Sequence, residues 1–533
     1  MLVQADAVDL PPSPAPPERR KRWFTHANSS DAKRPSATLA QQRAGSASMA
    51  GSRARSARVF VGRCWASGCR HRARGDRPIS AGSLPSGSDE SRRHPGLSVA
   101  IVKQGRVSVV RAYGEAASGR AMRVDTPIAA ASLMKSITAT CVMQLVDSGK
   151  VKLDQPMHRY LRTFTLRDPG AAAAITVRHL LHHNSGLADS GFPEMRLPQP
   201  ASIAKRVSDL AGAHSVGAPG SAFHYFNPNY DLLARIVEVQ SGLPFQDYVE
   251  RFIFTPLRMR SSTVRPTMQA LRRAVPESGE PLAQGHVEAF GLAVAMDEGD
   301  GYLGGAGGLL TTAEDMAQWL AFQAGDGTAG GHRVLSAKGL SRVHEPAYGQ
   351  PYAMGWFITK VGGRQALFHN GILSTFYAEM TLFADTGDGF VILANVNGLL
   401  PVRRAFPAIR EGLVALIAGE QPPASGLGSR AMVAAFFLAW TTVCLMALFD
   451  LWRQLRAVAS IPRSRVAVGV ALRLVPLLLL ITVPWTVAHF SDRVFAVQAL
   501  GLAMIDVLAG WLVVALVEVA AAAALLRRFF SER

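Results

Sequence analysis

A serine and a lysine three residues apart stand where a run of small residues turns into an apolar stretch. Ser132 and Lys135 directly precede the apolar segment Ile137–Val146. Because residues i and i+3 share a helix face, a helix that begins at Ser132 brings the lysine amine within reach of the serine oxygen. A serine hydroxyl is a weak nucleophile until a neighbouring base or neutral amine activates it. The pair therefore predicts a covalent nucleophile, whose backbone N–H at a helix start can also donate to an oxyanion.

The same Ser-x-x-Lys spacing occurs at two other places, so the motif alone does not identify the nucleophile. Ser30 and Lys33 lie in a polar, arginine-rich tract that cannot bury them. Ser202 and Lys205 follow Pro198-Gln199-Pro200 and precede an arginine, which again offers no dry pocket. We therefore assign the nucleophile to the copy with apolar surroundings.

Two further stretches present polar side chains beside a helix start or a turn. Tyr225 and Asn227 lie in an aromatic loop just before the amphipathic segment Leu232–Gln240. Taken alone, an aromatic residue in that position is more often a packing anchor than a reacting group. His369 ends a β-type run two residues before Gly371, where the missing side chain permits close approach of the backbone to a ligand.

The positioning elements lie in residues 94–420, which have the pattern of a mixed domain. Two β-branched runs around Gln104-Gly105 predict a hairpin at its beginning, and short β-type runs from Met354 to Ala394 predict an antiparallel meander at its end. Segments with N-cap and glycine C-cap residues lie between them and predict helices. The sequence therefore predicts an α/β (α+β) domain.

The chain before this domain has a different composition. Of the net charge of +18 in 533 residues, an excess of about 10 positive charges over negative ones falls before Pro95. Residues 1–93 are rich in Pro, Ser, Ala and Arg and lack a sustained apolar period, which predicts a disordered basic tail. Since no nucleic-acid-binding motif accompanies the charge, we predict no nucleic-acid partner.

Neither the cysteines nor the histidines have the spacing of a metal site. The four cysteines are scattered over the tail, the apolar helix and a membrane-like run, as Cys64, Cys69, Cys141 and Cys444. His179 and His183 lie one helical turn apart, but the glutamate of a zinc-protease motif is missing. We therefore predict no disulfide scaffold, no metal and no cofactor.

After a proline-containing linker at 421–430, residues 431–533 read as a transmembrane region with about three helices. The apolar runs, each long enough to cross a bilayer, are Ala431–Phe449, Val466–Val487 and Met504–Leu526. Arg473, Asp506 and Glu518 are charged exceptions that must face a neighbouring helix or the interface. Asp492–Leu502 is a candidate interfacial amphipathic segment, which leaves a count of three or four spans open.

Arginines between the first spans and after the last one favour a cytoplasmic location for those segments. They are Arg453, Arg456, Arg463, Arg465, Arg527 and Arg528. The domain at 94–420 is then extracytoplasmic in a multi-pass protein of the cell membrane, with the lipid bilayer as a partner. Residues 1–93 contain no apolar run of the roughly 7 to 15 residues that a secretory signal needs. We therefore expect that the start of the chain is incomplete or misassigned.

In order and spacing, Ser132-Leu-Met-Lys135, Tyr225-Phe-Asn227 and His369-Asn-Gly371 resemble the motifs of the serine β-lactamase and penicillin-binding-protein-like family, in particular its class C and esterase branch. The resemblance covers about residues 95–418. It implies an antiparallel sheet formed by the N-terminal hairpin and the C-terminal strands. Helices flank that sheet in the family, and a largely helical region is inserted between its two parts.

The resemblance also implies a role for each motif residue. Ser132 attacks a carbonyl, Lys135 and Tyr225 transfer its proton, and Asn227 positions the substrate. We expect the lysine and the tyrosine to lower each other's pKa, and burial to lower the pKa of the amine further. The third motif lines the opposite wall, and the backbone N–H groups of Ser132 and Ile372 form the oxyanion hole.

The third motif departs from the β-lactamase pattern, because His369-Asn-Gly371 stands where those enzymes carry Lys-Thr-Gly. A lysine offers a cation to the carboxylate of a β-lactam, whereas a histidine is largely neutral near pH 7. The predicted function is a membrane-anchored serine hydrolase that acts on esters, or on amides and D-amino-acid peptides, with a small-molecule or peptidoglycan-like acyl substrate.

Other functions remain open. A β-lactamase or DD-carboxypeptidase uses the same nucleophile, and a non-catalytic penicillin- or muropeptide-binding sensor keeps the same pocket. About three spans with few intramembrane charges make a poor transport pathway, so a transporter is the weakest alternative.

Overall fold

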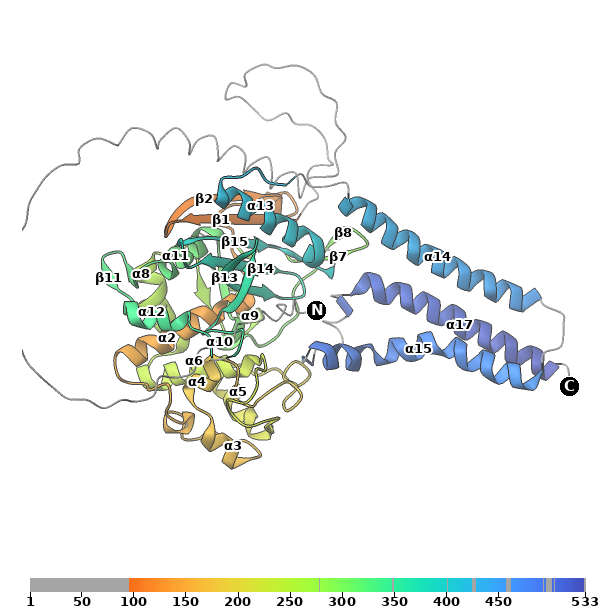
Figure 1. Cartoon of the computed structure of the whole chain (residues 1–533), viewed down its shortest axis with the longest axis horizontal. Coiled ribbons are helices and arrows are strands. Elements are labelled where there is room, and N and C mark those ends of the chain that lie inside the picture. Colours follow the sequence, from red (N-terminus) through yellow and green to blue (C-terminus); the bar gives the residue numbers. More distant parts are fainter. Residues whose placement is uncertain are drawn as a thin grey trace, which may run out of the picture.

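The computed structural model describes residues 95–277, 279–347, 349–399, 401–423, 428–456, 462–491, 493–494, 501–502 and 504–531. The predicted basic tail at 1–93 lies outside the described residues, as does part of the predicted linker. The described residues form a main domain (95–420) and three long C-terminal helices (Figure 1).

A six-stranded antiparallel sheet is the centre of the main domain. In spatial order its strands are β12 (Phe357–Val361), β13 (Arg364–Ile372), β14 (Tyr377–Phe383), β15 (Asp388–Ala394), β1 (Leu97–Lys103) and β2 (Arg106–Tyr113). Strand β1 pairs with β15 from Leu97 opposite Ala394 to Val102 opposite Gly389. The N-terminal hairpin is thereby joined to the C-terminal meander, and both predictions from the β-branched runs are confirmed.

The two faces of the sheet are buried by different helices, and β1 shows the alternation. Leu97, Val99 and Ile101 point into a core formed with α13 (Phe406–Ala418), while Ala100 and Val102 point into the larger core on the other face. This period of two is what a strand buried on both faces requires. On the larger-core side, α11 (Ala313–Gln323) packs against β1, β2 and β15 (Figure 1).

All residues from 114 to 356 are inserted between β2 and β12, and they are largely helical, as the resemblance implied. The helices are α2 (Met134–Asp147), α3 (Pro169–Ala174), α4 (Val177–Leu181), α5 (Ile203–Asp209), α6 (Asn227–Ser241), α7 (Phe245–Val249), α8 (Thr255–Leu257), α9 (Met268–Arg272), α10 (Gly304–Gly307), α11 and α12 (Ala337–Val343). Helix α2 packs against α6, α10 and α12 and is buried along most of its length, so it is a fixed support for whatever its first turn carries.

Short strands complete the insertion. They are β3 (Glu115–Ala117), β4 (Arg120–Ala121), β5 (Ile128–Ala129), β6 (Thr263–Val264), β7 (His286–Ala289), β8 (Leu292–Ala295), β9 (Leu309–Thr311), β10 (Thr328–Ala329) and β11 (His332–Arg333), and β16 (Val396–Asn397) follows β15. Strand β9 lies between β5 and β6. The β7–β8 hairpin projects from the domain toward the C-terminal helices (Figure 1), and Phe290, Leu292 and Val294 at its tip are exposed.

The C-terminal helices are α14 (Gly428–Arg456), α15 (Arg463–Ser491) and α17 (Ile505–Ser531). Helix α17 packs against both of the others. They extend away from the main domain, with the end of α15 and the start of α17 near the domain and the chain end at the far side (Figure 1). Two helices among the described residues are long and apolar enough to cross a membrane, by length and composition, over Arg465–His489 and Ile505–Phe530. That any of the three predicted runs crosses a membrane remains a prediction.

The three charged exceptions that the sequence singled out, Arg473, Asp506 and Glu518, have partners. Arg473 forms an ion pair with Asp450 and another with Glu518, the latter at 2.6 Å between Nη1 and Oε2. Asp506, at the start of α17, accepts a hydrogen bond at 2.5 Å from the backbone N–H of Phe290 in the main domain. The C-terminal helices are thus joined to one another and to the β7–β8 hairpin by polar contacts.

Candidate active site

Ser132 lies in a tight turn that leads into α2. Residues Ala131–Leu133 form a single 3-10 turn and α2 itself begins at Met134, so the serine sits just before the helix rather than as its first residue. Ala131 has a φ of 46°, which is unusual for a residue with a Cβ atom and marks a locally strained backbone. This turn sits at the head of the buried helix and presents the serine Oγ to Lys135 and Tyr225.

Lys135 is fully buried, and its amine has three partners. Nζ donates to Ser132 Oγ at 3.0 Å, to Asn227 Oδ1 at 2.9 Å and to the carbonyl oxygen of Ala306 at 2.8 Å. Burial, and next the positive charge of Arg493, lower the pKa of the Lys135 amine to about 7. A substantial fraction of the amine is therefore neutral near pH 7 and able to accept a proton.

Tyr225 approaches the same serine oxygen from the other side, and its hydroxyl donates to Ser132 Oγ at 3.0 Å. Its ring lies 4.9 Å from Lys135 Nζ and packs against His183 with ring centroids 4.5 Å apart. The prediction of a lowered tyrosine pKa is wrong. Burial raises the pKa of Tyr225 to about 12, because it outweighs the hydrogen bond to Ser132 and the charge of Arg493. Tyr225 is therefore a neutral phenol that can relay a proton.

Asn227 is the first residue of α6, and its amide is held at both ends. Its Oδ1 accepts from Lys135 Nζ, and its Nδ2 donates to Glu194 Oε1 at 2.7 Å. Since the Glu194 carboxylate accepts from the Nδ2 side, the orientation of the amide is determined by that partner. Pro228 in the first turn of α6 sets the backbone angle with which the helix begins.

Strand β13 brings the third motif against the turn that holds the serine. A Cβ atom on Gly371 would lie 2.0 Å from the carbonyl oxygen of Ala130 and 3.2 Å from the backbone nitrogen of Ser132. Only glycine permits this approach. Ile372, the next residue, is partly exposed and lines a cavity of about 110 Å³ together with Ser132 and Asn227. The two predicted oxyanion-hole segments, at 132 and 372, therefore meet at one cavity.

His369 is placed differently from the other motif residues. It is 1% exposed, its Nε2 lies 3.1 Å from the hydroxyl of Tyr352, and its Nδ1 lies 2.7 Å from the carbonyl oxygen of Asn370. Burial, and next the charge of Lys135, lower the pKa of His369 to about 3, so the ring is neutral near pH 7. It packs beside the Tyr225 ring, with centroids 6.1 Å apart, and does not line the cavity.

Of the two competing Ser-x-x-Lys sequences, the one at Ser202 and Lys205 lies within the described residues, and it caps a helix. Ser202 is the N-cap of α5, and its Oγ accepts a hydrogen bond from the backbone N–H of Lys205 at 3.2 Å. The Lys205 amine is exposed and pairs with Asp209, away from the serine. The copy at residues 30–33 lies outside the described residues.

The two histidines considered for zinc also support local structure. His179 belongs to the capping box of α4, where its Nδ1 accepts from the backbone N–H of Thr176 at 3.2 Å. His183 is fully buried, and its Nδ1 accepts from the backbone N–H of Phe226 at 3.2 Å. His183 thereby holds the loop that carries Tyr225.

Three residues at the site have no counterpart in the sequence motifs. Glu194 holds the amide of Asn227, and Asp189 is a fully buried carboxylate. Arg493 comes from the segment between α15 and α17, and its Nε donates to Asp189 Oδ2 at 2.8 Å. The prediction of an interfacial segment at 492–502 stays a prediction; within it, the Arg493 side chain is buried against the main domain. In the sequence, Arg493 is marked only by its place beside Asp492 between two apolar runs.

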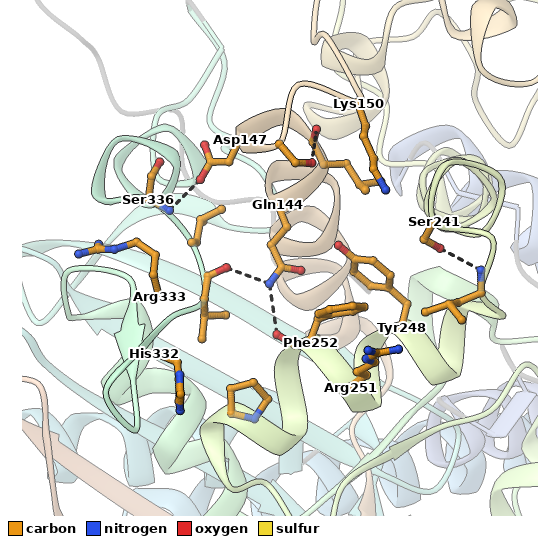
Figure 2. Close-up of a pocket in the computed structure, with 16 residues that line it drawn as sticks. Gln144, Asp147, Lys150, Ser241, Tyr248, Arg251, Phe252, His332, Arg333 and Ser336 are labelled. Atoms are coloured by element: carbon orange, nitrogen blue, oxygen red, sulfur yellow. Dashed lines mark hydrogen bonds between the residues drawn. The ribbon is translucent and has the colours of Figure 1, made fainter.

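A much larger cavity, of about 930 Å³, lies at the other end of α2 (Figure 2). Gln144 stands in it and donates to the carbonyl oxygens of Phe252 at 3.2 Å and Val334 at 2.9 Å. Gln144 follows Lys135 by nine residues, which is about 14 Å along a helix axis. This cavity is therefore separate from Ser132 and is not the space where a Ser132 adduct would form.

Comparison with known proteins agrees with this geometry. The β-lactamase family model matches residues 81–413, more than half of the chain. Protein flp of Staphylococcus aureus (strain MW2) is 26% identical over 316 residues, which are 57% of this chain and 60% of that protein. Penicillin-binding protein 4 of Amycolatopsis lactamdurans is 27% identical over 316 residues, which are 56% of this chain and 81% of that protein. The chain thus spans about 60% of the length of the staphylococcal relatives that it matches.

The fold is shared with a solved structure. The octameric penicillin-binding protein homologue from Pyrococcus abyssi superimposes with a TM-score of 0.51 at 22% sequence identity, over 62% of this chain and 74% of that one. The antiparallel sheet with its helical insertion, the serine, lysine and tyrosine that meet at one oxygen, and the family match over residues 81–413 lead to one assignment. The chain belongs to the β-lactamase family.

Proposed function

We propose that the protein is a membrane-anchored serine hydrolase that forms an acyl-enzyme on Ser132. The observation that carries the proposal is that two groups, an amine and a phenol hydroxyl, both contact the Ser132 oxygen. Lys135 Nζ and the Tyr225 hydroxyl both lie 3.0 Å from Ser132 Oγ, so a base and a proton relay stand beside the nucleophile.

Acylation begins when Ser132 Oγ attacks the carbonyl carbon of the substrate and its proton passes to the neutral amine of Lys135. The carbonyl oxygen becomes an oxyanion, which the backbone N–H groups of Ser132 and Ile372 stabilise, by roughly 3 to 4 kcal/mol per donor in other enzymes. Collapse of the intermediate breaks the bond to the leaving group. That group takes its proton from the Tyr225 hydroxyl, which regains one from the Lys135 ammonium.

Deacylation repeats these steps with water in place of Ser132. The water gives one proton to the neutral amine of Lys135 and attacks the acyl carbon. The bond to Ser132 Oγ then breaks, Oγ takes a proton from the Tyr225 hydroxyl, and Tyr225 regains one from the Lys135 ammonium. The network returns to its starting state, with a carboxylic acid as the product.

The proposed substrates are small esters, or amides and D-amino-acid peptides without a required carboxylate. His369 stands where a lysine would supply a cation, and it is neutral and buried away from the cavity. The catalytic groups need only a reactive carbonyl, so uncharged acyl donors should react. A DD-carboxypeptidase or β-lactamase activity is the second candidate, because the relative from Amycolatopsis lactamdurans is named a penicillin-binding protein.

The proposed location is the cell membrane, with the main domain outside the cytoplasm. Two apolar C-terminal helices have the required length and composition. The chain end and the start of α15 lie at the far side of the helices from the main domain (Figure 1), and both carry arginines that favour the cytoplasm.

The test is covalent labelling of the purified full-length protein with a fluorophosphonate and a fluorescent penicillin, followed by mass spectrometry of the adduct. We expect a fluorophosphonate adduct on Ser132 that Ser132→Ala abolishes and Ser202→Ala leaves intact. An adduct that survives Ser132→Ala would remove the assignment. A penicillin adduct without turnover of p-nitrophenyl butyrate would favour the sensor over the hydrolase.

A further inference from the structure

Arg493 links the C-terminal helices to the wall of the active site. It lies in the segment between α15 and α17, more than 260 residues after Tyr225, yet only 4% of its surface is exposed. A buried arginine needs charged or polar partners, because an unpaired guanidinium loses its hydration without compensation. Its partners among the described residues belong to the main domain.

The first contact anchors the segment. Arg493 Nε donates to Asp189 Oδ2 at 2.8 Å, and the backbone N–H of Val494 donates to the same oxygen at 3.1 Å. Asp189 itself is fully buried. One carboxylate oxygen thus binds both the Arg493 side chain and the Val494 backbone and holds these two residues on the domain.

The remaining contacts lead directly to the reacting groups. Arg493 Nη2 lies 3.6 Å from Glu194 Oε1, the oxygen that accepts from Asn227. Its Nη1 donates to the carbonyl oxygen of Tyr225 at 3.5 Å, and its Cζ lies 5.2 Å from the centroid of the Tyr225 ring. Two residues, Glu194 and Asn227, therefore lie between the guanidinium and Lys135 on one side, and one residue, Tyr225, lies between it and Ser132 on the other.

Arg493 also acts on the Lys135 amine through its positive charge. Three groups that can carry a charge face the amine: Glu194, Asp231 and Arg493. The histidine and tyrosine rings around it are His183, His369, Tyr225 and Tyr230. Arg206 faces Asp231, and Asp189 pairs with Arg493. Without Arg493, the carboxylates at 189 and 194 would lose a cation that neutralises them.

We propose that Arg493 is a positioning residue of the acylation machinery, so that the active site is complete only when Arg493 and Val494, between α15 and α17, are docked on the main domain. This inference rests on the proposed function of Ser132 and Lys135. The C-terminal helices are then part of the enzyme and do more than hold it at a membrane.

The sign of the effect on Lys135 follows from the charges. The positive charge of Arg493 opposes protonation of the amine and lowers its pKa, whereas Glu194 and Asp231 raise it. Removal of the arginine should therefore raise the pKa of Lys135. Because the neutral amine is the base, the acidic limb of the profile of kcat/KM against pH should move to higher pH.

The experiment compares wild type, Arg493→Gln and Arg493→Lys in the full-length detergent-solubilised protein. The measured quantity is kcat/KM for p-nitrophenyl butyrate from pH 5.5 to 9.5, per site titrated with a fluorophosphonate. We expect the acidic limb of Arg493→Gln to move up by about one pH unit, so that kcat/KM at pH 6.5 falls about tenfold. Arg493→Lys keeps a charge and should keep the limb near that of wild type.

Arg473→Gln is the matched control, because it removes a paired arginine from the same helices without touching the main domain. It should leave the acidic limb unmoved. An equal shift in Arg473→Gln, or an unmoved limb in Arg493→Gln, would overturn the proposal and reduce Arg493 to a structural contact. If Arg493→Gln does not fold, Glu194→Gln tests the same electrostatic effect with the opposite sign. Loss of that carboxylate should lower the pKa of Lys135 and move the acidic limb to lower pH.

A separate arm distinguishes failure of this inference from failure of the proposed function. Competitive acetylation of Lys135 with acetic anhydride at a series of pH values, read by mass spectrometry, reports its pKa without turnover. If the wild type neither labels at Ser132 nor turns over substrate, the proposed function fails. The acetylation profiles of wild type and Arg493→Gln still support the docked arginine if they differ, and reject it if they coincide.

Discussion

At the scale of single residues, the site divides proton transfer between two groups with very different acidities. Burial brings the pKa of Lys135 down to about 7 and raises the pKa of Tyr225 to about 12. The amine is the group that changes charge near neutral pH, and the phenol stays protonated. Activity should therefore follow the ionisation of the Lys135 amine near pH 7, with that of Asp231, whose pKa burial raises to about 7, in the same range. The sequence led us instead to expect two lowered pKa values.

This division makes the lysine and tyrosine one functional unit. Lys135→Met and Tyr225→Phe should each lower kcat/KM of p-nitrophenyl butyrate by a factor of 10² to 10⁴, the usual range for loss of general acid–base catalysis. The double variant should lose little more than the worse single variant. The double-mutant cycle, with concentrations set by Ser132 titration, measures the coupling. Losses that multiply would mean that the two groups act independently.

The buried position of His369 changes what a lysine at that place can do. His369→Lys would put an ammonium among aromatic rings and within the field of Lys135, without access to the cavity. We expect a lower Tm and no gain in nitrocefin hydrolysis, because burying a second cation costs free energy and provides no contact with a carboxylate. Thermal unfolding and nitrocefin kcat/KM check this, with Lys338→His at the surface as a control. Faster nitrocefin hydrolysis would show that position 369 reaches the substrate.

At the scale of elements, β13 and the turn before α2 depend on each other through one glycine. Gly371→Ala would force a Cβ atom against the carbonyl oxygen of Ala130, so β13 must move away from Ser132. Since the donors of an oxyanion hole must hold their positions closely, kcat should fall by about 10² to 10³. Gly212→Ala is the control, because a Cβ there meets no atom within 4 Å. Steady-state kinetics on both variants decide the question, and a fall of less than threefold in Gly371→Ala contradicts the close approach.

The elements also show which parts of the structure the sequence could predict. The strands of the sheet follow from local alternation and turn residues, as in β1, where Val99 and Ala100 point to opposite faces. The Ser132 turn follows from its buried surroundings. The pairing of Arg493 with Asp189 joins residues 304 positions apart. No local pattern encodes such a contact, because it depends on the packing of the C-terminal helices. For the same reason the burial of His369 against Tyr352 could not be predicted from β13 alone.

At the scale of the whole molecule, the arrangement of the C-terminal helices gives a prediction about topology. In intact cells, an added protease should digest the main domain and leave the helices protected, since the domain is proposed to lie outside the cytoplasm. Two epitope tags are read by immunoblot. A tag in the surface turn at Gly331 reports the main domain, and a tag at the C-terminus reports the helices. Permeabilised cells are the control and should expose the C-terminal tag. A main domain that stays intact until permeabilisation reverses the proposed orientation.

The β7–β8 hairpin has a consequence for how substrates arrive. The backbone N–H of Phe290 binds Asp506 at the first turn of α17, and Leu292 beside it is 69% exposed. With α15 and α17 in a bilayer as proposed, this apolar tip would lie at the level of the lipid headgroups, and the proposed nucleophile Ser132, joined to Arg493 through Tyr225, would lie on the membrane side of the domain. An acyl donor carried by a lipid in that leaflet then searches for the serine by lateral diffusion in two dimensions. An acyl donor fixed in the cell wall lies farther from the membrane. The main domain cannot move out to meet it, because Asp506 and Arg493 hold the domain to the C-terminal helices.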